Sequence, residues 1–244
     1  MYEFESFAYL PLQKTGSTFI IDFFKRYCRE RPVPARKHEP LDIEQYDPRK
    51  LYLISVRNPL DQYISLYSFG VGGRGSLYRR MRRSGYDALF DGTAEGFRLW
   101  LKLVLRPSSA ALLDSEYASI GNEIVASLVG YQSYRYLRLA IPSADKVLEG
   151  CGSEDEVRGC FHQRNIVGFV IRNESLNSDL ATLAQTKLRD TITDLDEALK
   201  YLEEAGRKNA SKRIDQYGEA IQLGDKLKKR LQSREWLLND LFGY

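Results

Sequence analysis

The sequence is poor in cysteine and histidine. Its three cysteines, Cys28, Cys151 and Cys160, form an odd number, and no pair has the C-x-x-C spacing of zinc or thiol-exchange motifs. Reduced thiols are the simplest interpretation, although Cys151 and Cys160 could pair in an oxidising compartment. No stretch approaches the roughly 20 consecutive apolar residues of a membrane-spanning helix. We therefore expect neither a C-x-x-C metal or redox motif nor an integral membrane segment.

Positive and negative side chains nearly balance, and the net charge is only +3 at pH 7. A low net charge, with no stacking motif beside the basic residues, argues against a nucleic-acid partner. The basic residues are nevertheless unevenly distributed along the chain, because "RGSLYRRMRRSG" contains five arginines between Arg74 and Arg83 and no acidic residue. A solvated loop is the first interpretation of this run, and attraction of an anionic glycan or a lid is the second.

The chain also lacks repeats, low-complexity tracts and an N-terminal targeting pattern. Its 244 residues, 43% hydrophobic and 28% charged, have the composition of an ordinary globular protein. We predict one domain over residues 1–244, with a mobile basic insertion at about 70–92. If Met1 is the natural start, a cytoplasmic location is expected. The sequence leaves the oligomeric state open.

A strand, a polar loop and a helix are predicted at the start of the chain, in "FAYLPLQKTGSTFIIDFF". The apolar run at 7–12 ends in a proline region and suits a buried strand, and Phe19 to Tyr27 repeat apolar residues at helical spacing. Ser17 or Thr18 is available as the helix N-cap. Free backbone N–H groups and the helix dipole would then face an anion held by the loop. Only Gly16 is present, whereas the usual triphosphate loop, G-x-x-x-x-G-K-[ST], needs two glycines.

The same order of elements recurs later in the chain. "KLYLISVR", residues 50–57, reads as a second buried strand, and Asn58 and Pro59 lead into a helical pattern. "NIVGFVI", residues 165–171, is a third strand candidate. Further helices are predicted at 94–105, 118–140, 176–188 and 195–205, and one terminal helix is predicted at 220–242. The pattern predicts an α/β fold with a central parallel sheet flanked by helices, whose ligands bind at the carboxyl ends of the strands.

Arg57 and Ser65 could form a second anion site. Arg57 closes a strand and Ser65 lies about two turns into the next helix, where a guanidinium and a hydroxyl could converge on a phosphate. A simpler alternative is an arginine paired with Asp61 beside a solvated serine. Likewise, the Lys14 to Thr18 loop could be plain turn and cap chemistry. Two neighbouring anion sites together fit a nucleotide with phosphate at both its 5′ and 3′ positions.

These two segments resemble motifs of the sulfotransferases that use 3′-phosphoadenosine 5′-phosphosulfate (PAPS). "LPLQKTGSTFIIDFF" is similar to their 5′-phosphosulfate loop, and "YLISVRNPLDQYISLYSF" to their 3′-phosphate motif, R-[ND]-P with a serine eight residues after the arginine. Weaker similarity to Golgi-type carbohydrate sulfotransferases and their bacterial relatives extends through "GYQSYRYL", "VGFVIRNESLNSDLATL" and "WLLNDLFGY". Only the first quarter of the chain carries well-defined motifs.

The resemblance implies a P-loop nucleotide-kinase-like fold, PAPS as donor, 3′-phosphoadenosine 5′-phosphate (PAP) as product, and no metal. By position, Lys14 would contact the transferring sulfonate. The expected nucleotide-binding residues are Lys14, Thr15, Gly16, Ser17 and Thr18 at the 5′-phosphate, Arg57 and Ser65 at the 3′-phosphate, and Ser211, Lys212 and Arg213 in a closing loop. A solvated basic loop explains the last three equally well.

Sulfonate transfer also needs a base to take the acceptor's proton. The resemblance places this base in "ARKHEP", where His38 and Glu39 are adjacent. His38 is favoured slightly because histidine titrates near neutrality, and a structural role for it stays open. We expect a hydroxyl acceptor, on a carbohydrate. The alternatives are a P-loop kinase or nucleotide hydrolase, and a non-catalytic nucleotide- or glycan-binding protein on the same fold.

Overall fold

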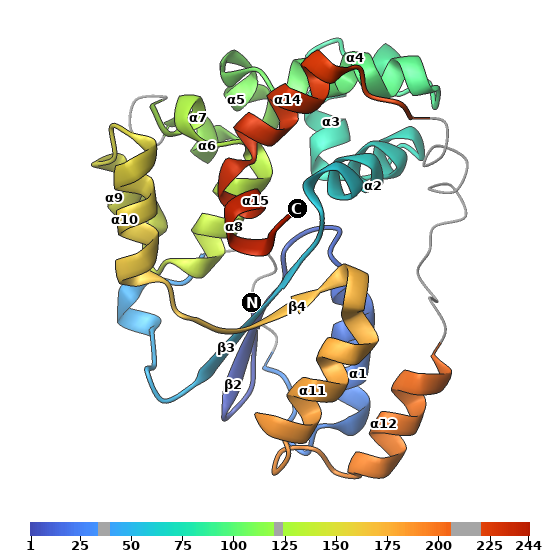
Figure 1. The fold of residues 1–244 in the computed structure, drawn as a ribbon, viewed down its shortest axis with the longest axis vertical. Helices are drawn as coiled ribbons and strands as arrows, with labels where there is room; N and C mark the ends of the chain where they lie inside the picture. The colour runs from blue at the N-terminus through green and yellow to red at the C-terminus, as the bar shows by residue number, and fades with distance from the viewer. Residues whose placement is uncertain (34–39, 120–123, 206–220) are drawn as a thin grey trace. The chain divides into compact units, whose positions relative to one another are not determined.

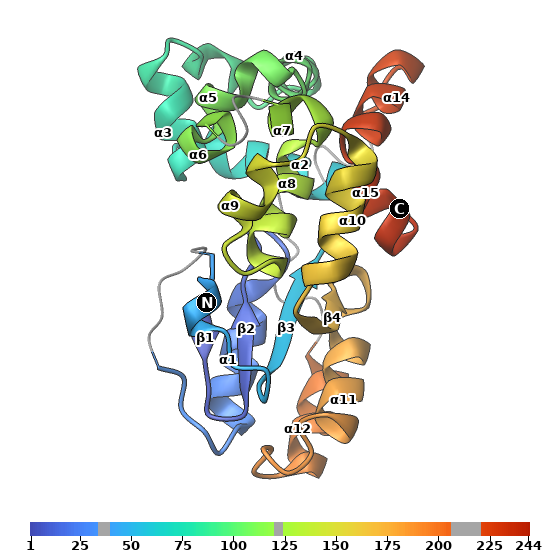
Figure 2. The same cartoon turned by 90° about the vertical axis from the view of Figure 1, so that its left-hand side faces the viewer.

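The chain folds into two compact units. The structure, a computed structural model, describes residues 1–33, 40–119, 124–205 and 221–244, and Figures 1 and 2 draw it from two sides. The first unit comprises Met1–Arg57, Leu139–Ser143 and Asn165–Ala210, and the second comprises Asn58–Arg138, Ala144–Arg164 and Ser211–Tyr244. In sequence, most of the second unit is therefore inserted within the first. The assignment of the whole chain to one domain stays a prediction.

The first unit is built on a four-stranded mixed sheet. Its strands are β1 (Tyr2–Glu3), β2 (Phe7–Leu10), β3 (Leu51–Val56) and β4 (Val167–Arg172), in the order β1-β2-β3-β4. β2, β3 and β4 run parallel, whereas β1 pairs antiparallel with β2. The prediction of an α/β fold with flanking helices is confirmed. The predicted central parallel sheet is formed by β2, β3 and β4, and β1 makes the whole sheet mixed; β1 is too short for its side-chain pattern to indicate a strand.

Proline sets the end of the second strand. β2 stops at Leu10, two residues before the predicted end, because Pro11 has no N–H to continue the ladder. All four residues of β2 are buried, as are Tyr52 to Val56 in β3, so both strands lie inside the unit as their continuous apolar runs predicted.

Three helices share a core with this sheet: α1 (Ser17–Tyr27), α11 (Leu176–Thr186) and α12 (Leu195–Glu204), as Figure 1 shows. The apolar face of α1, which includes Phe19, Ile20 and Phe24, packs into this core. The predicted N-cap is wrong, because Gly16 rather than Ser17 or Thr18 occupies it. Gly16 adopts the left-handed conformation, which leaves Ser17 as the first helical residue.

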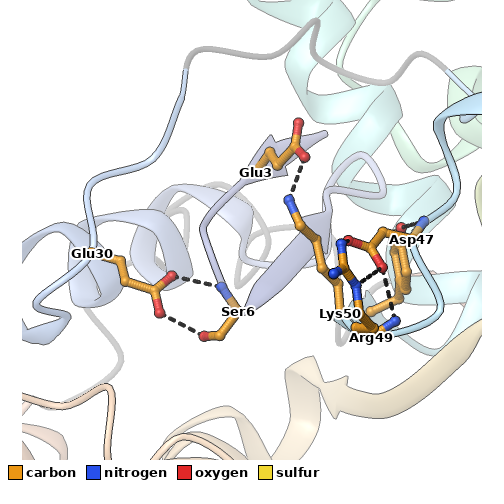
Figure 3. A network of polar contacts seen from close by, with 7 residues as sticks. Glu3, Ser6, Glu30, Asp47, Arg49 and Lys50 are labelled. Carbon is orange, nitrogen blue, oxygen red and sulfur yellow. Dashed lines mark hydrogen bonds and ion pairs between the residues drawn. The ribbon is translucent and has the colours of Figure 1, made fainter.

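Polar contacts at the periphery of the first unit link β1 to segments distant in sequence (Figure 3). Lys50 Nζ lies 2.5 Å from Glu3 Oε1, and the Ser6 hydroxyl donates to Glu30 at 2.6 Å. Arg49 forms two bonds to the Asp47 carboxylate from an exposed turn. The Lys50 and Glu30 contacts connect β1 and the turn after it to β3 and to the chain that follows α1.

Among its described residues, the second unit is helical. Its helices are α2 (Pro59–Val71), α3 (Ser76–Arg83), η2 (Asp87–Leu89), α4 (Ala94–Val104), η3 (Pro107–Ser109), α5 (Ala110–Leu113), α6 (Ser115–Ser119), α7 (Ile124–Leu128), α8 (Tyr131–Ala140), α9 (Ala144–Glu149), α10 (Glu154–Arg164), α14 (Asp225–Arg234) and α15 (Trp236–Phe242). The segment 70–92, predicted as a mobile insertion, contains α3 and η2. Within the ranges given above, no helix combines the length and the apolar character needed to cross a membrane.

A buried carboxylate links the C-terminal helices to the start of α8 through hydrogen bonds. Glu235, fully buried between α14 and α15, accepts bonds from the Tyr63 hydroxyl at 2.5 Å and from the backbone N–H and hydroxyl of Ser133, both at 2.8 Å. The N–H of Gln132 donates to it as well, at 3.2 Å. Glu235 separates α14 from α15, where the sequence pattern predicted one continuous terminal helix.

Candidate functional site

The loop between β2 and α1 has an unusual backbone. Lys14 has a φ of 65° and Gly16 a φ of 90°, so two of three consecutive residues lie in the left-handed region. Lys14 is one of only two non-glycine residues with positive φ among those described. Alternation of left- and right-handed residues turns successive N–H groups toward one side and makes a concave anion-binding nest. Strain of this kind at a non-glycine residue indicates a functional constraint.

Gly16 is required for two separate reasons. Its φ of 90° strains any other residue, and a Cβ added there would lie 2.7 Å from Leu176 Cδ1 and 2.9 Å from Asn173 Nδ2. Asn173 belongs to η5 (Asn173–Ser175), which follows β4. The structure therefore brings the end of β4 against the loop, and the side-chain amide of Asn173 lies directly over Gly16.

The first turn of α1 leaves backbone donors free of helical bonds beside the loop. No side chain among the described residues caps Gly16, and the first helical bond runs from the N–H of Ile20 to the carbonyl of Gly16. The N–H groups of Ser17 and Thr18 precede that bond, at the positive end of the helix dipole. Ser17 is partly exposed and Thr18 is exposed. Both predicted residues therefore lie at the helix start, where their backbone can meet an anion.

The side chain of Thr15 is turned inward. Thr15 is fully buried, and its hydroxyl donates to the carbonyl of Leu12 at 2.7 Å and lies 2.6 Å from Ser55 Oγ. Ser55 Oγ in turn lies 2.6 Å from the Tyr9 hydroxyl. The backbone N–H of Thr15, rather than its hydroxyl, is thus the group that this residue can offer to a ligand.

Arg57 approaches the loop from the next strand. It directly follows β3, which is parallel to β2, and its Nη1 lies 3.4 Å from the carbonyl oxygen of Lys14. The carboxyl ends of two neighbouring parallel strands therefore bring Lys14 and Arg57 together, as the sequence predicted. This convergence places the guanidinium of Arg57 beside the backbone of the loop, which favours an anionic ligand.

Ser65 belongs to the second unit. It lies on α2 and is 7% exposed. Asn58 caps this helix by accepting from the N–H of Leu60 at 3.0 Å, and Pro59 occupies the first position, so the R-N-P segment ends a strand and starts a helix as predicted.

Several predicted residues lie outside the described part of the chain. His38 and Glu39 fall within residues 34–39, and Ser211, Lys212 and Arg213 fall within residues 206–220. Their proposed roles as base and closing loop stay predictions.

Several other reactive side chains of the described residues lie away from the loop in sequence. Glu174 is exposed in η5, and the ring of His162 contacts that of Phe161 on α10. The Sγ atoms of Cys151 and Cys160 are 3.4 Å apart, and both cysteines are free thiols. Burial raises the pKa of Cys151 to about 12, so this thiol stays protonated near neutral pH.

Sequence reasoning missed Tyr9, Ser55 and Asn173. A signal existed for Ser55, because a hydroxyl inside the buried run "LYLISV" needs a partner. Its partner could not be identified without the register that sets β2 against β3. Asn173 gave no signal, since its place over Gly16 depends on how β4 aligns with the rest of the sheet.

The described residues hold no group of three or more His, Cys, Asp or Glu side chains suited to a metal ion. What the first unit does present is a loop with two left-handed residues and the guanidinium of Arg57 beside it, which can bind an anion and stabilise charge that develops on it. Comparison of the chain with protein-family models, with curated proteins and with solved structures found no match.

Proposed function

We propose that this protein is a sulfotransferase that moves a sulfonate group from PAPS to a hydroxyl, on a carbohydrate acceptor, and that its sheet belongs to a P-loop nucleotide-kinase-like fold. The observation that carries the proposal is the loop from Lys14 to Gly16. It holds two left-handed residues at the carboxyl end of a parallel strand, and the guanidinium of Arg57 contacts it. The sequence resemblance to PAPS-dependent sulfotransferases supports the choice of nucleotide.

The residues of the loop suit a nucleotide with two phosphate groups. The N–H groups of Thr15, Gly16, Ser17 and Thr18 would hold the 5′-phosphosulfate, and the missing Cβ of Gly16 lets Leu176 and Asn173 pack against the loop. Arg57 would hold the 3′-phosphate, whereas the role of Ser65, which belongs to the second unit, stays a prediction from the sequence. Lys14 is the only charged residue between Lys14 and Thr18, and its ammonium would add a positive charge to the backbone donors of the loop.

PAPS supplies an activated sulfonate whose nucleotide leaves as PAP. Charge grows on the leaving oxygen during such an in-line transfer, and a lysine ammonium with oriented N–H groups stabilises that charge where it forms. Lys14 would perform this role. A base opposite the donor would take the acceptor's proton, for which His38 is the first candidate and Glu39 the second.

Calorimetric titration tests the proposal before the acceptor is known. We expect the protein to bind PAP more tightly than adenosine 5′-monophosphate or ATP with Mg²⁺. Arg57→Ala should weaken PAP binding about 10- to 100-fold, because a charge-assisted hydrogen bond contributes about 1.5–3 kcal/mol. Arg49→Ala is the matched control, since this exposed arginine of the same unit pairs only with Asp47 among the described contacts that involve it.

Other outcomes would redirect the assignment. Preference for ATP with Mg²⁺ would favour a kinase or nucleotide hydrolase. PAP binding without turnover on any hydroxyl acceptor would favour a non-catalytic binding protein. If turnover occurs, Lys14→Ala should reduce it by about 10²- to 10³-fold, the usual effect of removing one group that stabilises transition-state charge.

A further inference from the structure

Three buried hydroxyl groups form a continuous chain beneath the loop. The hydroxyl of Tyr9 lies 2.6 Å from Ser55 Oγ, which lies 2.6 Å from Thr15 Oγ1, which donates to the carbonyl of Leu12 at 2.7 Å. The three residues Tyr9, Ser55 and Thr15 are each 0% exposed. Water therefore does not compete for these bonds, and each hydroxyl depends on the next.

The direction of the chain follows from counting protons. A carbonyl oxygen only accepts, so Thr15 must use its single hydroxyl proton on Leu12. Ser55 must then donate to Thr15, and Tyr9 must donate to Ser55. Burial raises the pKa of Tyr9 above its ordinary value of 10, so the phenol keeps the proton that starts the chain. All three bonds thus point from the sheet toward the loop.

The sheet fixes the origin of this chain. Tyr9 on β2 pairs with Leu53 on β3, and Ser55 is two residues further along β3, on the same face. Tyr9 and Ser55 are therefore diagonal neighbours on two hydrogen-bonded strands, within reach of a long aromatic side chain. At the other end, Thr15 lies between the two left-handed residues Lys14 and Gly16. The hydroxyl chain thereby connects the two strands to the residues of the loop whose backbone conformation is the most restricted.

We propose that Tyr9 and Ser55 are positioning residues: by holding Thr15, they set the backbone of residues 14–16 in its anion-binding conformation before the ligand arrives. This inference rests on the proposed function of the loop as a PAPS site. It explains why an inward-facing threonine stands in a loop whose other polar side chains are at least partly exposed. Pre-organised donors bind without an ordering cost at the moment of binding.

The test compares two tyrosines of the same sheet. Tyr9→Phe removes the first hydroxyl of the chain. Tyr52→Phe is the matched control, because Tyr52 is 3% exposed and its hydroxyl accepts a bond from the N–H of Asp47 at 3.0 Å, away from the loop. PAP affinity should fall about 5- to 20-fold in Tyr9→Phe, the equivalent of one or two lost hydrogen bonds. It should stay within about twofold in Tyr52→Phe, although each variant loses one hydrogen bond.

Thr15 and Ser55 provide independent variants. Thr15→Val keeps the shape but removes the hydroxyl, and Thr15→Ser keeps the hydroxyl. Ser55→Ala breaks the chain at its centre without changing Tyr9. We expect Thr15→Val and Ser55→Ala to behave like Tyr9→Phe and Thr15→Ser to retain most of the affinity. If Tyr9→Phe does not fold, the Ser55 and Thr15 variants alone decide the question.

A second measurement separates this inference from the proposed function. Hydrogen exchange at the amides of residues 13–18, in the protein without nucleotide, should be faster in Ser55→Ala and Thr15→Val than in the wild type and unchanged in Tyr52→Phe. Faster exchange with no PAP binding by the wild type would support positioning and reject the PAPS site. Unchanged exchange together with unchanged PAP affinity in both variants would overturn the inference while leaving the PAPS site intact.

Discussion

The two units bury polar groups in different ways. In the first unit, the buried network is neutral, consisting of three hydroxyls that end at a loop carbonyl. In the second, it is centred on a charge, the carboxylate of Glu235, which accepts four bonds from Tyr63, Gln132 and Ser133. One network ends at a partly exposed loop, and the other joins helices to one another.

The difference shows that the free-energy cost of burying a polar group differs between the two networks, and so does the structural role of each. A buried carboxylate is costly to remove from water and is tolerated only when several donors surround it, which makes it a strong anchor. Neutral hydroxyls cost less free energy to bury than a carboxylate. Because each hydroxyl carries one proton, a chain of them has a fixed donor-to-acceptor direction. A charged anchor suits the joining of helices, whereas a neutral chain can shape a loop without repelling the anion that the loop binds.

The largest expected effect is the loss of the charged anchor. Glu235→Ala leaves the N–H groups of Gln132 and Ser133 and the Tyr63 hydroxyl without their acceptor, and should lower the free energy of unfolding by about 3–5 kcal/mol. Both tryptophans, Trp100 and Trp236, are buried in the second unit, so intrinsic fluorescence in a urea titration reports this loss.

Glu149→Ala provides the control, because this exposed glutamate in the same unit should change stability by no more than about 0.5 kcal/mol. A loss below about 1 kcal/mol in Glu235→Ala would mean that the carboxylate is not the anchor of the C-terminal helices.

A smaller effect is expected at the glycine of the loop. Gly16→Ala introduces a left-handed alanine and a clash with Leu176 and Asn173, and should cost about 1–3 kcal/mol while also abolishing PAP binding. Gly73 has a φ of 70° with nothing within 4 Å of an added Cβ, so Gly73→Ala incurs the backbone cost alone. Equal melting temperatures for the two variants would show that Asn173 and Leu176 move aside readily.

The strained lysine should give an effect of opposite sign. A left-handed conformation costs a non-glycine residue about 1–2 kcal/mol, and glycine recovers most of this despite its larger unfolded-state entropy. Lys14→Gly should therefore be more stable than Lys14→Ala by up to about 1 kcal/mol in thermal unfolding, although both lose the ammonium. Sulfonate transfer, where measured, should fall in both. A less stable glycine variant would show that Lys14 is not strained.

The smallest effect concerns the exposed pair in Figure 3. Hydrogen bonds from Arg49 lower the pKa of Asp47 from 3.8 to about 2. Because the folded-state pKa is depressed, the stabilisation is present above pH 4 and is lost as the pH falls toward 2. Arg49→Ala should return the pKa of Asp47 toward 3.8 in a carboxyl NMR titration. High salt should reduce the wild-type shift, and a salt-independent shift would contradict this account.

Local patterns explain what the sequence predicted correctly. The strands around Tyr9 and Ile54, the helix after Gly16 and the turn at Asn58 follow from apolar periodicity, proline and capping residues. These features depend on neighbours within a few positions. The closeness of Lys14 and Arg57 was also predictable, because parallel strands place their carboxyl ends at one edge.

Long-range alignment explains what the sequence did not predict. The contact of Ser55 with Thr15 requires the register between β2 and β3, and the place of Asn173 requires that of β4. The pairing of β1 and the break of the terminal helix at Glu235 likewise depend on partners far along the chain. Contacts between residues so far apart in the sequence produce no periodic pattern from which they could be predicted.

The pairing of β3 with β4 has a consequence for how the protein is made. Leu53 pairs with Phe169, and most of the second unit is encoded between them. On the ribosome, β2, the loop and β3 emerge long before the strand that completes their sheet, and pairing over such a separation is slow. Until then the unpaired backbone N–H and C=O groups along this edge of β3 can pair with other chains. The fold therefore creates a period of risk during synthesis, in which chaperone binding would protect the nascent chain.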